Sequence, residues 1–581
     1  MGGWNMATGK AAATVSPQRI FRSVRATAQS NLDPLGLFMP LVNAQWAWLT
    51  HPQELAEAAA EFSTRLLALQ WHSCRRLAGL QSADAEQPHP DDTRFADPVW
   101  QESAGWDLVK EGYLLLTHQI QDMLYQTPGL SGRERRRAAF WWRKWLNAAA
   151  PTNFLPTNPV ALRKAAESNG ASLLRGWHNF VADLQAGSVR MTRPDDFKVG
   201  VNLAATPGKI VLRNRLLELI HYAPVAAQVH RQPLLIVTPW INKYYILDLA
   251  PKKSMIRFLL EQGFDVYVTS WKNPDAAMAE VGFEDYLTEG IDAAVTAMRA
   301  ISGAAQVHAA GYCIGGTALA TYLAWANRRA APGGAPIASA TFFTTLVDFH
   351  KPGDIEVFLD EGSYRYLARR MQDKGFLDGG EMAAAFRLLR SNSLIWHYVV
   401  HGYLYGETPP PFDVLYWNMD TTRMPARMHA WYLRNLYLDN KLIRRDALEL
   451  AGQPIDLARI VQPLYAVAAA DDHIAPWRQT FRINNYLSGE KRFVLSSSGH
   501  ILGIVNPVVH PPKREFWVAG AERHDNPDSW RERAEHRKGS WWEDWVAWLR
   551  PRAGERVKPG PAGCPEFPAR AEAPGTYVLE S

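Results

Sequence analysis

Apolar residues recur at intervals of three and four along the first third of the chain, the spacing of one face of an α-helix. In the segment 52–80 these apolar positions are Leu55, Phe62, Leu66, Leu67, Leu69 and Leu80. The same period returns over 106–125, 133–148 and 159–184. No segment before residue 190 has the pattern of a strand. The sequence therefore predicts a mainly helical N-terminal domain over 1–190, whose first 30 residues are expected to be poorly ordered.

The pattern changes after residue 190, where short, β-branched apolar runs alternate with helical stretches. These runs are 233–238, 265–270, 306–311, 337–346, 463–469 and 492–495. Short buried strands separated by helices are typical of a parallel sheet with crossover helices. The sequence therefore predicts an α/β domain over 191–581.

The interval between the strands predicted at 337–346 and 463–469 is far longer than an ordinary crossover requires. It contains Trp396, Trp417, Trp431 and many Tyr and Phe residues. We interpret 348–445 as a large inserted cap. The tail 551–574 is rich in Pro and Gly, and we expect an extended arm over the surface.

Composition narrows the class of protein. The chain has 581 residues, of which 47% are hydrophobic and 21% charged, which is typical of a globular protein. The net charge of +5 comes from 63 basic and 58 acidic side chains that are interspersed, which argues against a nucleic-acid-binding protein. No apolar run reaches the length of a membrane span, and residues 1–25 lack the apolar core of a secretory signal. The 23 Trp residues indicate a large aromatic core or, alternatively, apolar surface that meets an apolar ligand.

Three cysteines, Cys74, Cys313 and Cys564, are too few and too scattered for a disulfide framework or a zinc site. They indicate a reducing, cytoplasmic compartment. Cys313 lies in Gly-Tyr-Cys-Ile-Gly-Gly at 311–316, between a predicted strand and a predicted helix. This is the context of the nucleophile elbow of α/β hydrolases, with Cys in place of Ser. A helix N-terminus favours the thiolate, so we predict that Cys313 is a nucleophile; the alternative is a buried Cys in a Gly-containing turn.

The elbow predicts its partners in the chain order nucleophile, acid, base. Asp472 follows the strand at 463–469, and His500 follows the strand at 492–495. His500 is then the base that takes a proton from Cys313, and Asp472 holds the imidazole in the required tautomer. The oxyanion donors are expected to be the backbone N–H of Ile314 and an N–H near Trp240 and Ile241, in the turn after the first α/β strand.

Other residues compete for these roles. Asp348 also ends a predicted strand and is an alternative acid, whereas Asp471 adjoins Asp472 but points away from it. His308 is expected to be a packed histidine within a strand. His473 either lines the site or has a structural role. No metal or nucleotide motif is present, so we predict no cofactor.

The sequence is identified at this point as resembling the class I polyhydroxyalkanoate synthases. The resemblance covers about 90–581 and includes the motifs around Cys313, Asp472 and His500. Further motifs are Thr-Pro-Gly-Lys at 206–209, Pro-Trp-Ile-Asn-Lys-Tyr-Tyr-Ile-Leu-Asp at 239–248 and Pro-Phe-Asp-Val-Leu-Tyr-Trp-Asn at 411–418. Pro-Thr-Asn-Phe-Leu at 151–155 and Pro-Gly-Thr-Tyr-Val-Leu-Glu at 574–580 also match. One departure is Ser393, where the family has Asp.

The resemblance implies an α/β-hydrolase fold with a mobile cap, acting on short-chain (R)-3-hydroxyacyl-CoA. Cys313 would carry the growing polyester, and CoA would be the leaving group. Arg390 would lie near the CoA entrance, with Trp417, Asn418 and His473 close to the site. A homodimer is implied, as are a cytoplasmic location at the polyester granule surface and contacts with granule-associated proteins. The N-terminal domain would serve these granule, dimer and partner contacts.

Two other functions remain open on the residues alone. A thioesterase or an intracellular depolymerase could use the same Cys, His and Asp. A non-enzymatic granule-coating protein could use the aromatic and amphipathic surfaces, although an ordered triad argues against it.

Overall fold

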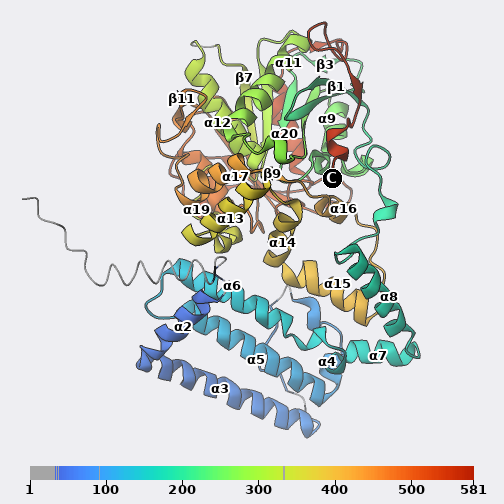
Figure 1. Cartoon of the computed structure of the whole chain (residues 1–581), viewed down its shortest axis with the longest axis vertical. Helices are drawn as coiled ribbons and strands as arrows, with labels where there is room; N and C mark the ends of the chain where they lie inside the picture. The colour runs from blue at the N-terminus through green and yellow to red at the C-terminus, as the bar shows by residue number, and fades with distance from the viewer. Residues whose placement is uncertain (1–32, 34–35, 37, 81, 90–91, 332–333) are drawn as a thin grey trace, which may run out of the picture.

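The computed structural model describes residues 33, 36, 38–80, 82–89, 92–331 and 334–581. The expectation of poor order in the first 30 residues lies outside this part of the chain. Figure 1 shows a helical part and an α/β part at opposite ends of the long axis, with α14 and α15 between them. No helix of the described residues is both long and apolar enough to cross a membrane.

The helical part contains the helices predicted over 52–80, 106–125 and 133–148, together with two that were not predicted, α2 and α4. Its helices are α2 (Met39–Leu49), α3 (Pro52–Leu77), α4 (Val99–Glu102), α5 (Ala104–Gln126), α6 (Gly132–Ala148), α7 (Pro159–Glu167) and α8 (Ala171–Ala186). The single helix predicted over 159–184 is wrong, because it is two helices. Asn169 and Gly170 have φ of 50° and 82°, and this left-handed backbone ends α7 before α8 begins. No named strand precedes residue 190 in the described residues.

An 11-stranded sheet in the order β15-β14-β13-β12-β7-β6-β4-β5-β2-β1-β17 forms the α/β part. The central parallel strands are those predicted: β4 (Leu234–Val237), β5 (Val266–Trp271), β6 (Val307–Tyr312), β7 (Ile337–Phe343), β12 (Leu464–Ala469) and β13 (Lys491–Ser496). The edges are antiparallel: β1 (Gly208–Arg213), β2 (Leu217–Tyr222), β14 (Glu515–Gly520), β15 (Glu535–Lys538) and β17 (Ala571–Glu572).

The prediction of a parallel sheet holds for the central strands, whereas the outer strands are antiparallel. Charged residues such as Lys209 and Arg213 interrupt β1, which lies next to the edge strand β17, and the edge strand β15 reads Glu-His-Arg-Lys, because strands at the margin of a sheet face water. Such strands lack the continuous apolar run of a central strand. The tail is extended as predicted, but it also pairs with the body: β16 (Arg556–Val557) joins β3 (Val229–His230), and β17 joins β1.

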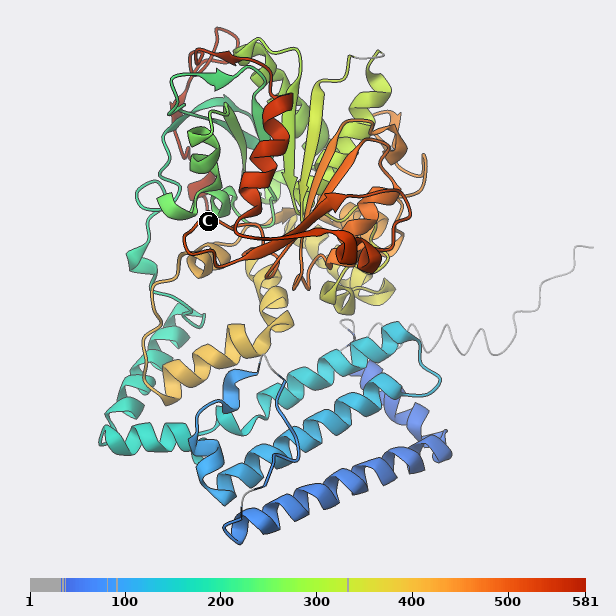
Figure 2. The ribbon, with the colours of Figure 1, turned by 180° about the vertical axis from the view of Figure 1, so that it is seen from behind.

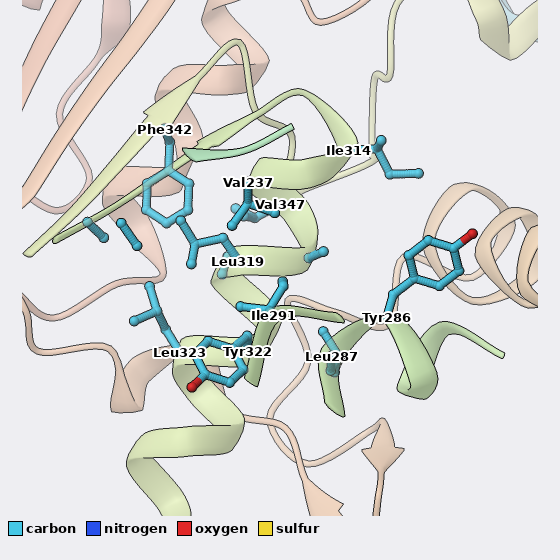
Figure 3. Packing of buried hydrophobic residues seen from close by; sticks show 14 of the residues in the cluster. Val237, Tyr286, Leu287, Ile291, Ile314, Leu319, Tyr322, Leu323, Phe342 and Val347 are labelled. Atoms are coloured by element: carbon cyan, nitrogen blue, oxygen red, sulfur yellow. The ribbon is translucent and has the colours of Figure 1, made fainter. Parts of the chain in front are cut away.

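Helix α12 (Ile314–Arg329) is the buried centre of the α/β core. Its side chains Leu319, Tyr322 and Leu323 pack among residues from two other elements (Figure 3). These residues include Phe342 of β7 and Ile291 of the π-helix Tyr286–Asp292. On the other face of the sheet lies α20 (Trp541–Leu549), whose Trp541, Trp542 and Trp545 are buried. Much of the unusual Trp content is thus core, although Trp46, Trp71, Trp145 and Trp177 are exposed.

The segment 348–445 leaves the sheet after β7 and is mainly helical. It contains α13 (Glu361–Lys374), α14 (Gly379–Leu389), α15 (His397–Val399), α16 (Asp413–Met419) and α17 (Ala426–Tyr432), with the short pair β8 (Phe376–Leu377) and β9 (Met424–Pro425). Figure 2 shows α14 and α15 reaching from the α/β part to the helical part. The molecule therefore has the α/β-hydrolase fold with a large inserted cap, preceded by a mainly helical N-terminal region, as the sequence predicts.

Candidate active site

Cys313 stands at the sharp turn between β6 and α12. Its φ of 53° and ψ of −122° are strained for a residue with a Cβ atom, which is typical of a nucleophile elbow. A Cβ on Gly311 would lie 2.5 Å from the Cα of Gly316, and a Cβ on Gly315 would lie 2.5 Å from the carbonyl oxygen of Val237. Glycine is therefore required at these positions, because the strand, the helix and the end of β4 approach so closely.

His500 and Asp472 lie beside Cys313, as the chain order predicts. The Nδ1–H of His500 donates to Oδ2 of Asp472 over 2.6 Å, and the side chains are 10% and 0% exposed. The other carboxylate oxygen, Oδ1, accepts from the backbone N–H groups of Ile474 and Ala475, each at 2.8 Å. These bonds hold the carboxylate still, so that it fixes the orientation of the imidazole.

The charge state of His500 follows from its surroundings. Burial disfavours the imidazolium, but the carboxylate of Asp472 and then the hydrogen bond and charge interaction with Cys313 outweigh it and hold the pKa of His500 above its usual range. The Tyr312 hydroxyl donates to the backbone oxygen of His500 over 3.2 Å and fixes the loop from the other side. The arrangement is able to move a proton between sulfur and imidazole.

The two backbone groups expected at the oxyanion position belong to the first turn of α12 and to the turn after β4. Ile314 is the first residue of α12, so its N–H has no acceptor within the helix. Ile241 lies in the turn after β4, and the close approach of Gly315 to Val237 and Thr238 brings that turn against the elbow. The hydroxyl of Thr422, in the cap, donates to the carbonyl oxygen of Ile241 over 2.6 Å. The cap therefore helps to hold this turn.

The rival residues are engaged elsewhere. Asp348 is buried and accepts from Tyr486 (2.7 Å), Asn440 (2.9 Å) and Arg482 (2.6 Å). Burial alone would raise the pKa of Asp348, but these partners hold the pKa below its usual range. Asp471 is exposed, whereas Asp472 is buried. His308 is fully buried against Ser339 at 2.7 Å, and burial lowers the pKa of His308 to about 4. The structure thus pairs His500 with Asp472 alone among the three acids.

The cap residues expected near the site come from two places. Trp417 is buried in the same cluster as Cys313, and its Nε1–H donates to the carbonyl oxygen of Lys243 over 2.7 Å, while Asn418 beside it is half-buried. Arg390 follows α14 and donates to Nδ1 of His473 over 3.3 Å. Burial and then Arg390 lower the pKa of His473 to about 4, so the ring is neutral and able to accept.

Two residues at the site were missed from the sequence. Tyr432 and Tyr437, in α17 and the π-helix that follows it (Leu433–Leu438), lie close enough for the charge of Cys313 to act on them. Burial, first of all, raises the pKa of both phenols, so they stay neutral. No local motif marks them, because only the folding of the cap brings them to the elbow.

One buried group in the helical part has ligand types suited to a metal, namely His72, Asp107 and Glu111. The ammonium of Lys110 lies 3.1 Å from each of the two carboxylates. His72 donates to Asp107 over 2.7 Å. The cluster is therefore a closed ion network in which the Lys110 ammonium lies where a metal ion would bind.

Comparison with known proteins gives matches over most of the chain. The family model described as "Poly-beta-hydroxybutyrate polymerase (PhaC) N-terminus" matches residues 91–259, and the model of the alpha/beta hydrolase fold matches 238–507. The chain is 41% identical to the poly(3-hydroxyalkanoate) polymerase of Methylorubrum extorquens, over 96% of this chain and 95% of the relative. It is 40% identical to the poly(3-hydroxyalkanoate) polymerase subunit of Cupriavidus necator, over 84% of this chain and 83% of the relative.

Proposed function

The chain belongs to the poly(3-hydroxyalkanoate) polymerase family of acyltransferases, and we propose that it polymerises short-chain (R)-3-hydroxyacyl-CoA through a thioester on Cys313. The single observation that carries the mechanism is the arrangement of a half-buried Cys313 with buried His500 and Asp472 at a strained elbow. Short-chain monomers, for example 3-hydroxybutyryl-CoA, are proposed from the class I resemblance of the sequence.

The first step transfers the acyl group from CoA to the protein. The Cys313 thiol gives its proton to His500, and the sulfur forms a bond to the thioester carbonyl carbon. The backbone N–H groups of Ile314 and Ile241 stabilise the oxyanion. The bond to the CoA sulfur then breaks, and CoA leaves with the proton from His500. Asp472 supports the imidazolium throughout.

Elongation joins two acyl groups. The hydroxyl of one 3-hydroxyacyl group gives its proton to His500 and attacks the carbonyl of the other, so that an ester forms and a thiol is released. Transfer from the CoA thioester to Cys313 exchanges one thioester for another and is near balance, which keeps the chain activated. An ester on serine would be lower in energy and slower to transfer. Tyr432, Tyr437 and Trp417 form an aromatic cover that excludes water, which would otherwise hydrolyse the chain.

The test is incubation of the purified protein with (R)-3-hydroxybutyryl-CoA, with free thiol and turbidity followed together. Thiol release with insoluble polyester is expected. Thiol release with only free 3-hydroxybutyrate would identify a thioesterase instead. Cys313→Ala is the matched control, and full polymer formation by this variant would refute the assignment of the nucleophile.

A location at the surface of the polyester granule is part of the same proposal. The helical part exposes large apolar side chains, with Leu67, Trp71 and Leu77 of α3 between 65% and 74% exposed. Such a surface suits an apolar product. Sedimentation of the protein with polyester particles, compared with Trp71→Ser, tests this; equal binding by both proteins would exclude α3 as the contact. A cytoplasmic homodimer remains a proposal from the resemblance.

A further inference from the structure

Three cations gather where the helical part, the cap and the active-site loop meet. Arg143 and Lys144 come from α6, and Arg390 follows α14. The Nζ of Lys144 donates to the carbonyl oxygen of Leu389, the neighbour of Arg390, over 3.1 Å. Arg390 itself reaches His473, the residue after Asp472. The cluster therefore adjoins the acid of the triad and draws on a part of the chain far from it in sequence.

Too little negative charge offsets these cations. None of the three forms an ion pair in the described part of the chain, and the acid that acts on all of them is Asp354. Burial raises the pKa of Asp354, and one carboxyl faces three cations. Burial and then the like charge of Arg143 lower the pKa of Lys144 to about 7. Cations held together in this way leave a favourable place for an anion.

A cavity of about 840 Å³ opens beside the cluster, lined by Arg143 of α6 and by Asp354. The backbone N–H of Asp354 donates to the carbonyl oxygen of His473 over 2.8 Å, so the cavity wall is joined to the active-site loop. Three other cations at the cavity are paired: Arg136 with Glu356, Arg478 with Asp528 and Arg482 with Asp348. Within the described residues, Arg143 and Lys351 form no ion pair at this cavity, and the size suits a nucleotide-sized ligand.

We propose that Arg143 and Lys144 of the helical part, together with Arg390, form a phosphate-binding site for the nucleotide end of the CoA thioester. The proposal rests on the proposed function for the identity of the ligand. It gives the helical part a direct role in substrate binding, because two of the three cations come from α6. CoA carries a diphosphate and a phosphate monoester, and Arg and Lys are the side chains that recognise such groups.

The test compares two thioesters in the full-length protein. With (R)-3-hydroxybutyryl-CoA, Arg143→Gln and Lys144→Gln are each expected to raise KM about tenfold, with kcat within about twofold of the parent. With the N-acetylcysteamine thioester, which has no phosphate, the variants and the parent are expected to react equally. Lys198→Gln removes an exposed cation elsewhere and is the matched control, expected to change neither substrate. Equal slowing on both thioesters would mean that the cations only dock the helical part, and would overturn the proposal.

A binding measurement separates this proposal from the proposed function. Calorimetric titration of parent and Arg143→Gln uses CoA, 3′-dephospho-CoA and inorganic phosphate. If Arg143→Gln raises the dissociation constant of CoA about tenfold, the site is supported even if the parent makes no polyester. CoA binding that is unchanged in the variant refutes the site even if the parent is an active polymerase. A third outcome is that Arg143→Gln weakens the binding of phosphate, but CoA does not displace the bound phosphate. This outcome would assign the site to free phosphate and would also refute the proposal.

Discussion

Replacement of Asp472 by Asn tests the centre of the mechanism. The carboxylate lies 2.6 Å from Nδ1 of His500, and both side chains are shielded from water. Asn has nearly the same shape but no charge, and it presents either an oxygen or an NH₂ group to the ring. The imidazolium that forms during acyl transfer then loses its counter-charge, and the imidazole loses its fixed tautomer. Acyl transfer should therefore slow by roughly 10²- to 10⁴-fold, which is about 3–5 kcal/mol in activation free energy.

The pH dependence of the variant gives a second readout. In the parent, Asp472 and Cys313 raise the pKa of His500 against the effect of burial. Without the carboxylate, only Cys313 opposes the lowering of the His500 pKa by burial, so this pKa should fall. The limb of the pH profile of kcat/KM that reports this histidine should therefore move to lower pH. A purely structural loss would lower the rate at every pH without moving the limb.

The assay is single-turnover release of CoA, followed with a thiol reagent, since it measures acylation before polymer forms. Asp471→Asn is the matched control, because it is the same substitution at the exposed neighbour, and its rate should equal the parent's. Asp348→Asn should lower thermal stability, because Arg482 and Tyr486 lose their buried partner, without a comparable loss of rate. An Asp472→Asn rate within about tenfold of the parent would refute the role of this carboxylate.

Three further changes have defined outcomes. Gly316→Ala should abolish CoA release and lower stability by about 1–3 kcal/mol, because the new Cβ would overlap the side chain of Thr345. Gly112→Ala is the control and should be tolerated, because the new Cβ would stand in open space. Equal activity of the two variants would contradict the packing argument. Lys110→Met should lower the thermal midpoint of the helical part. Asp107 keeps Arg76 and His72 as partners, but the buried carboxylate of Glu111 loses its cation, at a cost of about 3–5 kcal/mol. An unchanged midpoint in calorimetry would show the network to be neutral. Burial lowers the pKa of His429 to about 4, so between pH 6.5 and 4 the unfolded chain binds a proton that the native protein does not, and the free energy of unfolding falls as pH falls. Calorimetry should show that His429→Leu loses about 2 kcal/mol less of this free energy than the parent between pH 7 and 5. Equal losses in the two proteins would exclude His429 as the cause.

The elements that the sequence predicts well are those in which local pattern and burial agree. Strands β6 and β12 are buried on both faces, so β12 is a continuous apolar run and β6 is one interrupted by His308; the elbow at Cys313 has its glycines within a few residues. Asp472 and His500 follow from the same logic, because the fold places each at the end of a particular strand. The outer strands β1 and β15 were missed because charged residues lie near both ends of β1 and make up most of β15.

The residues that the sequence does not reveal reach the site by tertiary packing. Tyr432 and Tyr437 come from the cap, and Arg143 and Lys144 come from the helical part, each without a motif of its own. Their position depends on how separately folded segments dock. Arg390 was found only through the resemblance, and its contact with His473 becomes visible only when the cap is folded over the α/β part.

The cap is held by two kinds of contact, and their difference in strength indicates which side opens. Toward the elbow, Tyr432 is fully enclosed in the hydrophobic core. Toward the helical part, the contacts are a smaller apolar cluster, in which Val357 and Leu389 of the cap pack with residues of α6, and partly exposed ion pairs. Pairs such as Arg136 with Glu356 are each worth about 0.2–1 kcal/mol. We therefore expect the cap to open on the side of the helical part, where Arg143 and its neighbours attract phosphate. The aromatic side would then stay closed over the thioester, so that a charged substrate could enter while the reactive carbonyl remained away from water.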